Sequence, residues 1–106
     1  MRDNVKGGAL TEVTFLILLS LYEAKHGYAI MQFIEEQTQG RLCLGAGSLY
    51  GAINTLLEKQ WIVPVGDQSS RKKEYQITPL GKEITQQELK RIQEIIQIAN
   101  AIMEEK

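Results

Sequence analysis

Residues 47–65 read GSLYGAINTLLEKQWIVPV, and within them the hydrophobic pattern changes from helical to extended. Leu49, Ile53 and Leu56-Leu57 recur at spacings of four, seven and eight, which places them on one side of a helix. From residue 61 the run Trp-Ile-Val-Pro-Val favours a strand, in which the proline indicates an edge or an end. The sequence therefore predicts a helix over 47–60 and a strand over 61–65.

The other side of this helix is polar but nearly uncharged. It carries Ser48, Gly51, Asn54, Thr55 and Glu58, with Tyr50 at its edge. A helix face that only meets water more often carries glutamate and lysine. Small and hydrogen-bonding side chains indicate instead a face that approaches another surface.

A polar turn and a second strand follow. Residues 66–70, Gly-Asp-Gln-Ser-Ser, have turn chemistry. Residues 71–77 alternate, with Tyr75 and Ile77 on one side of the strand and polar side chains on the other. The two strands predict a hairpin whose tip carries three consecutive cations, Arg71, Lys72 and Lys73.

Two further helices are expected before residue 47. Residues 10–24 are apolar on nearly every face and begin near Thr11, which predicts a mostly buried helix. We expect Gly27 to end it in a positive-φ conformation. An amphipathic helix follows from about Tyr28 and ends at Gly40. Its apolar stripe is formed by Ile30, Phe33 and Ile34.

The residues after 77 predict a final helix with an unpartnered apolar side. Thr78-Pro79 opens this helix, since proline is favoured in a first turn. The coiled-coil seam is formed by Leu89, Ile92, Ile96, Ala99 and Met103, and it is broadened by Ile95, Ile98 and Ile102. Burying an isoleucine side chain is worth roughly 1.5–3 kcal/mol, so we expect this helix to hold a homodimer together.

The composition predicts one compact globular chain. It has 106 residues, 43% of them apolar and 24% charged, and a formal net charge of −1. No apolar run is long enough for a membrane span and no secretory signal opens the sequence, so we expect a cytoplasmic protein. The single cysteine, Cys43, cannot form an internal disulfide, and we expect it to be a small buried side chain.

The chain lacks the residues that the common kinds of enzyme need. One histidine and one cysteine leave no catalytic triad or metal-ligand set, and there is no phosphate-binding loop. We therefore expect no enzymatic activity, no cofactor and no bound metal. His26 and Tyr28 are interpreted as structural residues that join the first two helices.

The expected fold class is mainly α with a small β-hairpin (α+β), in winged helix-turn-helix order. In such proteins the third helix enters the major groove of DNA. Serine, tyrosine and asparagine side chains bind phosphate, and asparagine also reads adenine. We expect a DNA-binding domain over residues 1–80 and a dimerisation helix over 81–106. The candidate DNA-binding residues are Ser48, Tyr50, Asn54 and Thr55 on the helix and Arg71, Lys72 and Lys73 on the wing.

Four motifs resemble those of the PadR transcriptional regulators. They are His26-Gly27-Tyr28, GSLYGAI at 47–53, LEKQWI at 57–62 and SRKKEYQITPLG at 70–81. The resemblance covers residues 10–81, and the single final helix is similar to the compact subfamily. Gly51 stands where many members have proline, and Gln60-Trp61 replaces a commoner glycine-containing pair. These departures leave the DNA sequence preference open.

The predicted function is a DNA-binding transcriptional regulator that acts as a dimer on a palindromic operator. The two recognition helices are expected about 34–36 Å apart. We expect repression, because a protein on a promoter blocks polymerase. The resemblance implies sensing of a small hydrophobic or aromatic effector, with a pocket at the dimer interface between the first and fourth helices. Release from DNA is one expected response, and the sequence assigns no particular ligand and leaves tighter binding open. The alternative is a winged-helix module that binds protein and not DNA.

Overall fold

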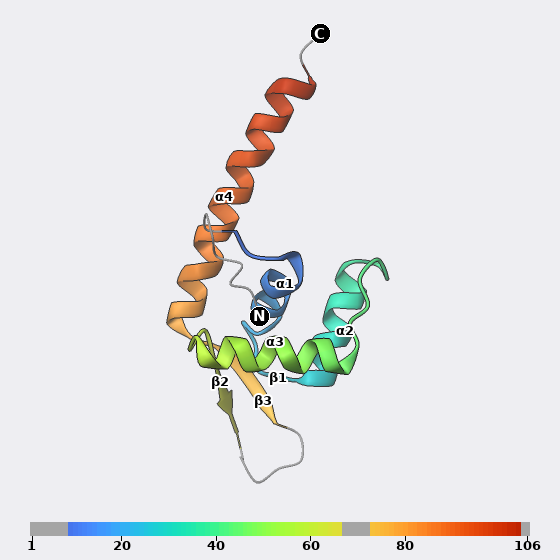
Figure 1. The fold of residues 1–106 in the computed structure, drawn as a ribbon, viewed down its shortest axis with the longest axis vertical. Coiled ribbons are helices and arrows are strands. Elements are labelled where there is room, and N and C mark those ends of the chain that lie inside the picture. Colours follow the sequence, from blue (N-terminus) through green and yellow to red (C-terminus); the bar gives the residue numbers. More distant parts are fainter. Residues whose placement is uncertain (1–8, 67–72, 105–106) are drawn as a thin grey trace.

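The computed structural model describes residues 9–66 and 73–104, which form four helices and a small sheet (Figure 1). The helices are α1 (Glu12–Ser20), α2 (Gly27–Gln37), α3 (Ala46–Glu58) and α4 (Pro79–Met103). The strands are β1 (Lys25–His26), β2 (Ile62–Val65) and β3 (Glu74–Ile77), paired antiparallel in the order β1-β3-β2. The expected winged helix-turn-helix fold is confirmed.

One core joins the first three helices to the sheet. Its buried side chains are Ile17, Leu18 and Leu21; Ile30 and Ile34; Leu49, Ile53 and Leu56; and Trp61, Ile62, Tyr75 and Ile77. The apolar side that the sequence predicts for the third helix is therefore confirmed, because it supplies three of these residues. Tyr75 and Ile77, predicted to share one side of their strand, are both buried.

The first helix ends earlier than we expected, and a third strand follows it. α1 stops at Ser20 and not at residue 24. The Leu21 carbonyl accepts a hydrogen bond from the N–H of Ile77, with an N···O distance of 2.9 Å. This bond holds the chain after α1 beside β3. Lys25 then pairs with Tyr75 in β1. A strand of two residues has no periodicity of its own, and only its pairing with β3 defines it.

Gly27 does not have the expected positive φ; it is the buried first residue of α2. His26 caps this helix, because its Nδ1 accepts a hydrogen bond from the N–H of Ala29 at 3.4 Å. The structural role of His26 is confirmed, whereas Tyr28 is 61% exposed. A Cβ at Gly27 would lie 2.7 Å from Cζ of Tyr50. The close approach of α3, and not the backbone conformation, requires glycine here.

α3 is followed by a tight reversal that starts the hairpin. Gln60 has a φ of 63°. Its N–H donates to the Leu57 carbonyl at 3.0 Å, and the N–H of Trp61 donates to the Leu56 carbonyl at 3.1 Å. These two bonds form a Schellman motif, in which glycine is the commoner residue. The helix therefore ends at Glu58, before the predicted residue 60.

The hairpin is shorter than predicted at both strands. β2 begins at Ile62, one residue after the expected start, because Trp61 belongs to the reversal. β3 begins at Glu74, where it pairs with Val65. Residues 71 and 72, which the sequence assigned to the second strand, lie outside the described residues.

α4 is anchored by its first turns and then projects away from the core. The Thr78 hydroxyl accepts a hydrogen bond from the N–H of Gly81 at 3.0 Å and donates one to the Gln60 carbonyl at 2.8 Å. Gly81, Thr85 and Glu88 are buried against the rest of the chain. Figure 1 shows the C-terminal part of α4 standing clear of the other elements, which makes the molecule elongated at 60 × 28 × 25 Å.

Replacing Gly81 with alanine is expected to destabilise the fold by about 1–3 kcal/mol in urea denaturation. The added Cβ would overlap the Trp61 carbonyl oxygen and lie 2.6 Å from Cγ1 of Ile77. The matched control is Gly51→Ala in α3, whose Cβ meets nothing within 4 Å. This control should gain about 0.5–1 kcal/mol. A neutral Gly81→Ala variant would contradict the close packing of α4 on Trp61.

Candidate nucleic-acid interface

The outward face of α3 presents the polar side chains that the sequence singled out. Ser48 and Asn54 are exposed, and Tyr50 is 44% exposed. Within the described part of the chain, the side chains of Ser48 and Asn54 make no hydrogen bond. Thr55 differs, because it is half-buried and its hydroxyl donates to the Gly51 carbonyl at 3.2 Å. Ser48 and Asn54 therefore present hydrogen-bonding groups that can bind a ligand on this face.

The first turn of α3 is open for a different reason. Its N-cap is Gly45, which provides no side-chain hydrogen bond. The other three helices are each capped by a side chain, from Thr11, His26 and Thr78. The first N–H groups of a helix have no partner within the helix, and they bind phosphate well. The turn that carries Ser48 thus presents backbone donors as well as a hydroxyl.

Tyr50 lies at the edge of this face and also packs inward. Its hydroxyl end covers the Cα of Gly27 at the start of α2. The pKa of Tyr75 in β3 is raised, mainly by burial and further by its electrostatic interaction with Tyr50. The contact with Gly27 places the end of the Tyr50 side chain against the start of α2. Its exposed part can meet a ligand, while its hydroxyl end contacts Gly27.

The wing extends from the end of the molecule opposite the C-terminus of α4 (Figure 1). Lys73 is exposed and directly precedes β3. The other two predicted wing cations, Arg71 and Lys72, lie outside the described residues. The hairpin and α3 are adjacent along the chain and in space, since Trp61 joins them.

Cys43, predicted to be buried, is exposed. It lies in the connection between α2 and α3, where its neighbours Leu42 and Leu44 are half-buried against the core. In an extended segment successive side chains point to opposite sides. Anchoring Leu42 and Leu44 in the core therefore turns Cys43 toward solvent.

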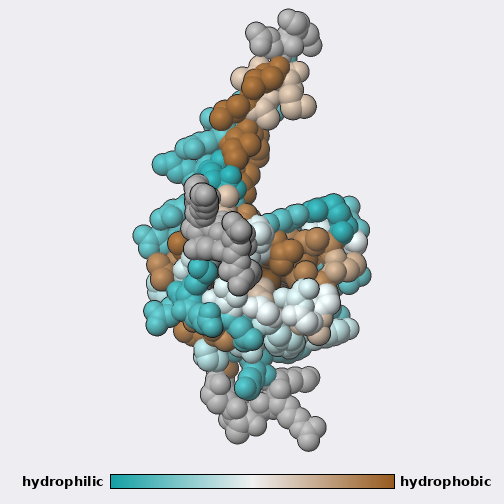
Figure 2. Space-filling view, in the orientation of Figure 1, coloured by the Kyte–Doolittle hydropathy of each residue, from teal (hydrophilic) through white to brown (hydrophobic). Residues whose placement is uncertain are grey.

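The predicted dimerisation seam of α4 is largely uncovered. Leu89 is 49% exposed and Ile96 51%, while Ile92 and Ala99 are half-buried and Met103 is at the exposed end. The flanking residues Ile95, Ile98 and Ile102 are also exposed. Figure 2 shows the resulting hydrophobic band along the projecting part of the helix. Such a band is much larger than the scattered apolar residues of an ordinary surface.

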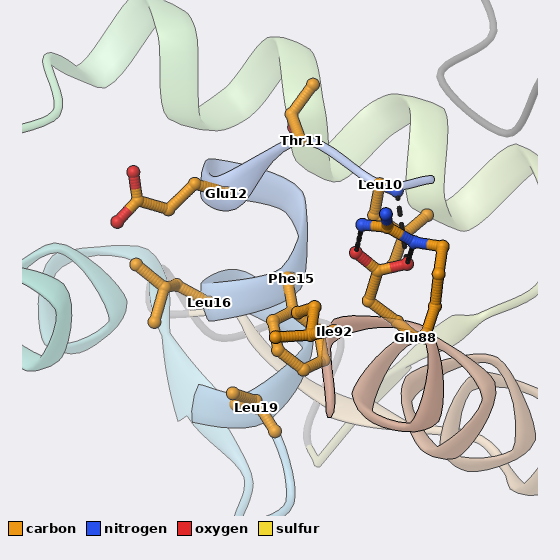
Figure 3. Close-up of a pocket in the computed structure, with 9 residues that line it drawn as sticks. Leu10, Thr11, Glu12, Phe15, Leu16, Leu19, Glu88 and Ile92 are labelled. Atoms are coloured by element: carbon orange, nitrogen blue, oxygen red, sulfur yellow. Dashed lines mark hydrogen bonds and ion pairs between the residues drawn. The ribbon is translucent and has the colours of Figure 1, made fainter. Parts of the chain in front are cut away.

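A pocket of about 400 Å³ lies between α1 and α4 (Figure 3). Phe15, Leu19 and Ile92 form its apolar wall. At its edge the Glu88 carboxylate accepts hydrogen bonds from Arg91 Nε at 2.9 Å and from the N–H of Leu10 at 3.4 Å. The bond to Glu88 raises the pKa of Arg91.

Sequence reasoning missed Glu88 as a buried site residue. The available signal was the spacing of Gly81, Thr85 and Glu88, which puts them on one helix face. That spacing does not tell whether the face meets water or protein. Glu88 is only 2% exposed, and its carboxylate accepts a hydrogen bond from the N–H of Leu10, 78 positions earlier in the sequence.

Other kinds of site find no support among residues 9–66 and 73–104. These residues contain no group of three or more His, Cys, Asp or Glu side chains that could hold a metal ion. Every buried side-chain nitrogen or oxygen in them has a hydrogen-bond partner. In the same residues, no helix is both long enough and apolar enough to cross a membrane.

The model of the transcriptional regulator PadR-like family matches residues 16–87, from α1 through the wing to the buried turns of α4. The chain belongs to the PadR-like family of transcriptional regulators. The resemblance drawn from the sequence motifs is thereby confirmed. PadR-like proteins are transcriptional regulators and not enzymes, which agrees with the lack of catalytic motifs in the sequence.

Solved structures of other regulators share this PadR fold. A transcriptional regulator from Clostridium thermocellum superposes with a TM-score of 0.76 at 24% sequence identity. The match covers 95% of this chain and 96% of the chain of that regulator. A PadR family regulator from Eggerthella lenta has a TM-score of 0.74 at 18% identity, with coverages of 89% and 83%. Bacillus subtilis PadR, solved in complex with operator DNA, has a TM-score of 0.63 at 21% identity, with coverages of 74% and 46%.

A curated relative is similar in sequence over part of its length. It is an uncharacterized 37.1 kDa protein in transposon TN4556 of Streptomyces fradiae, 37% identical over 78 residues. The match covers 73% of this PadR chain but only 22% of that protein. The likeness therefore concerns one segment of a much longer protein.

Gly27→Ala is expected to lower stability by about 1–3 kcal/mol, because the new Cβ collides with the Tyr50 ring. The loss should shrink in a Tyr50→Ala background, where the colliding atoms are gone. Urea denaturation of the two single variants and the double variant measures this coupling. Strictly additive effects would show that the ring does not pack on Gly27.

Proposed function

We propose that this PadR-family chain is a repressor that binds operator DNA with α3 and the wing. The observation that carries the proposal is the outward face of α3, where Ser48 and Asn54 are exposed on a helix whose start has no side-chain cap. The neighbouring fold of Bacillus subtilis PadR was solved with operator DNA, which supports the same use of the fold here.

Each proposed DNA-binding residue has a chemical role. Ser48 and Tyr50 donate hydrogen bonds to phosphate oxygens, and Asn54 pairs with a base edge. Thr55 contributes through its methyl group or a lone pair, because its hydroxyl proton is engaged with Gly51. The wing cations release counterions from the neighbouring backbone. They are Arg71, Lys72 and Lys73.

We further propose that the chain acts as a homodimer through α4. The supporting observation is the band of exposed apolar residues on a helix that projects from the core. Residues 1–80 then form the DNA-binding part and residues 81–106 the dimerisation helix. We expect the two recognition helices of this dimer to lie about 34–36 Å apart, the spacing that successive major grooves of a palindromic operator require.

The pocket between α1 and α4 is the proposed site of a small hydrophobic or aromatic effector. Its wall of Phe15, Leu19 and Ile92 suits an apolar ligand. Ile92 belongs both to this wall and to the dimer seam, so occupancy of the pocket alters the packing that sets the distance between recognition helices. We propose that a bound effector releases the protein from its operator, and that this takes place in the cytoplasm.

DNA binding is tested by fluorescence anisotropy with a duplex that the protein selects from a randomised pool. The Arg71/Lys72/Lys73→Ala variant should weaken binding to every duplex and lower the slope of log affinity against log salt by about 2–3. Asn54→Ala should reduce discrimination among duplexes and leave that slope unchanged. Failure to bind any duplex at low salt would favour the alternative, a module that binds protein.

Dimerisation is tested by light scattering of an Ile92→Glu/Ile96→Glu variant, which should be monomeric because the charges face the seam. The matched control is Gln93→Glu/Gln97→Glu, which places the same charges on the polar side of α4 and should stay dimeric. An unchanged mass in the isoleucine variant would exclude α4 as the interface.

A further inference from the structure

An ion pair ties the connection between α2 and α3 to the start of α1. Arg41 lies in this connection and Glu12 is the first residue of α1, 29 positions earlier. Arg41 Nη1 donates to Glu12 Oε1 at 3.2 Å, and Nη2 donates to Oε2. This paired geometry uses the planar fork of arginine, which lysine cannot supply. The hydrogen bond lowers the pKa of Glu12 and raises that of Arg41.

The backbone of the connection between α2 and α3 needs a contact that stabilises it. Gln39 has a φ of 53° and Gly40 a φ of 81°, and the left-handed region is unfavourable for a residue such as glutamine. Among the described residues, the other hydrogen bonds of residues 39–44 stay within α2 and the connection. Leu42 and Leu44 anchor it by apolar contact. The bridge to Glu12 is the directional contact that joins it to another helix.

The first turn of α3 depends on this connection more than other helix starts do. Its N-cap, Gly45, supplies no side-chain hydrogen bond, whereas Thr11, His26 and Thr78 cap the other three helices. Residues 38–45 therefore lead the chain into α3 without a side-chain cap at its start. Arg41 is the residue of that segment that reaches α1.

We propose that Glu12 and Arg41 are positioning residues that hold the first turn of the recognition helix in its DNA-binding position. The inference rests on the proposed function, because it concerns the same face of α3. Glu12 also lines the α1–α4 pocket, where its carboxylate points away from the Glu88–Arg91 pair (Figure 3). The bridge thus connects a wall of that pocket to the connection that leads into α3.

The test compares the DNA affinity of Glu12→Gln, Arg41→Gln and the double variant with that of the wild type. The duplex is one that the wild type selects from a randomised pool. Each single variant should weaken binding about three- to sixfold, and the double variant should be no weaker than either, because both changes break one bridge. Arg41→Lys should weaken binding like Arg41→Gln, since it keeps the charge but loses the fork. The salt slope should stay unchanged in all four.

Glu94→Gln and Lys90→Gln serve as matched controls for the change in net charge, because both residues are exposed and lie on α4, which carries neither partner of the bridge. Melting temperatures verify that every variant is folded. If Arg41 contacts phosphate directly, Arg41→Lys keeps its affinity, Glu12→Gln binds more tightly and Arg41→Gln lowers the salt slope by about 0.9. That result would overturn the proposal.

Two further outcomes separate the proposal from the function on which it rests. Affinities equal to those of the wild type in all bridge variants would overturn the positioning role alone. A wild type that selects no duplex would overturn the proposed function, and the positioning role with it.

Discussion

The junction at Ile77 and Thr78 holds the elements of this molecule together. The N–H of Ile77 donates to the Leu21 carbonyl, and the N–H of Thr78 donates to the Trp61 carbonyl, both at 2.9 Å. These bonds join the end of α1 and the start of the hairpin to the start of α4. Gly81 then packs directly on the Trp61 backbone. Because buried backbone groups must be paired, this junction fixes where α1 ends and how α4 leaves the core.

From that junction the structure extends in two directions. α3 and the hairpin lie at one end, and the apolar part of α4 projects at the other (Figure 1). The separation allows a second copy to cover the hydrophobic band of α4 without covering the polar face of α3. The α1–α4 pocket lies between the two ends. A change there is close to both the proposed dimer seam and, through Glu12, the entry to α3.

The candidate site differs from the rest of the described structure in that its helix start is uncapped and two of its polar side chains are unpaired. Elsewhere helix starts are capped and buried polar side chains are paired, as Glu88 is by Arg91 and the Leu10 N–H. On α3 the start is uncapped, and the side chains of Ser48 and Asn54 remain exposed. The sequence indicated this face by its shortage of charge. The sequence could not predict the packing of Tyr50 on Gly27, because α2 and α3 are brought together only by folding.

Local periodicity was sufficient for the helices, the hairpin and the apolar seam of α4, because spacings of 3.6 and 2 residues depend only on neighbouring positions. The order of the motifs was sufficient for the PadR family. The strand β1, the buried Glu88, the exposed Cys43 and the Glu12–Arg41 bridge required the tertiary structure. Each depends on partners far away in the chain, 78 residues apart for Leu10 and Glu88. Burial and pairing of this kind leave no periodic trace in the sequence, because they are decided by which surfaces meet when the elements pack.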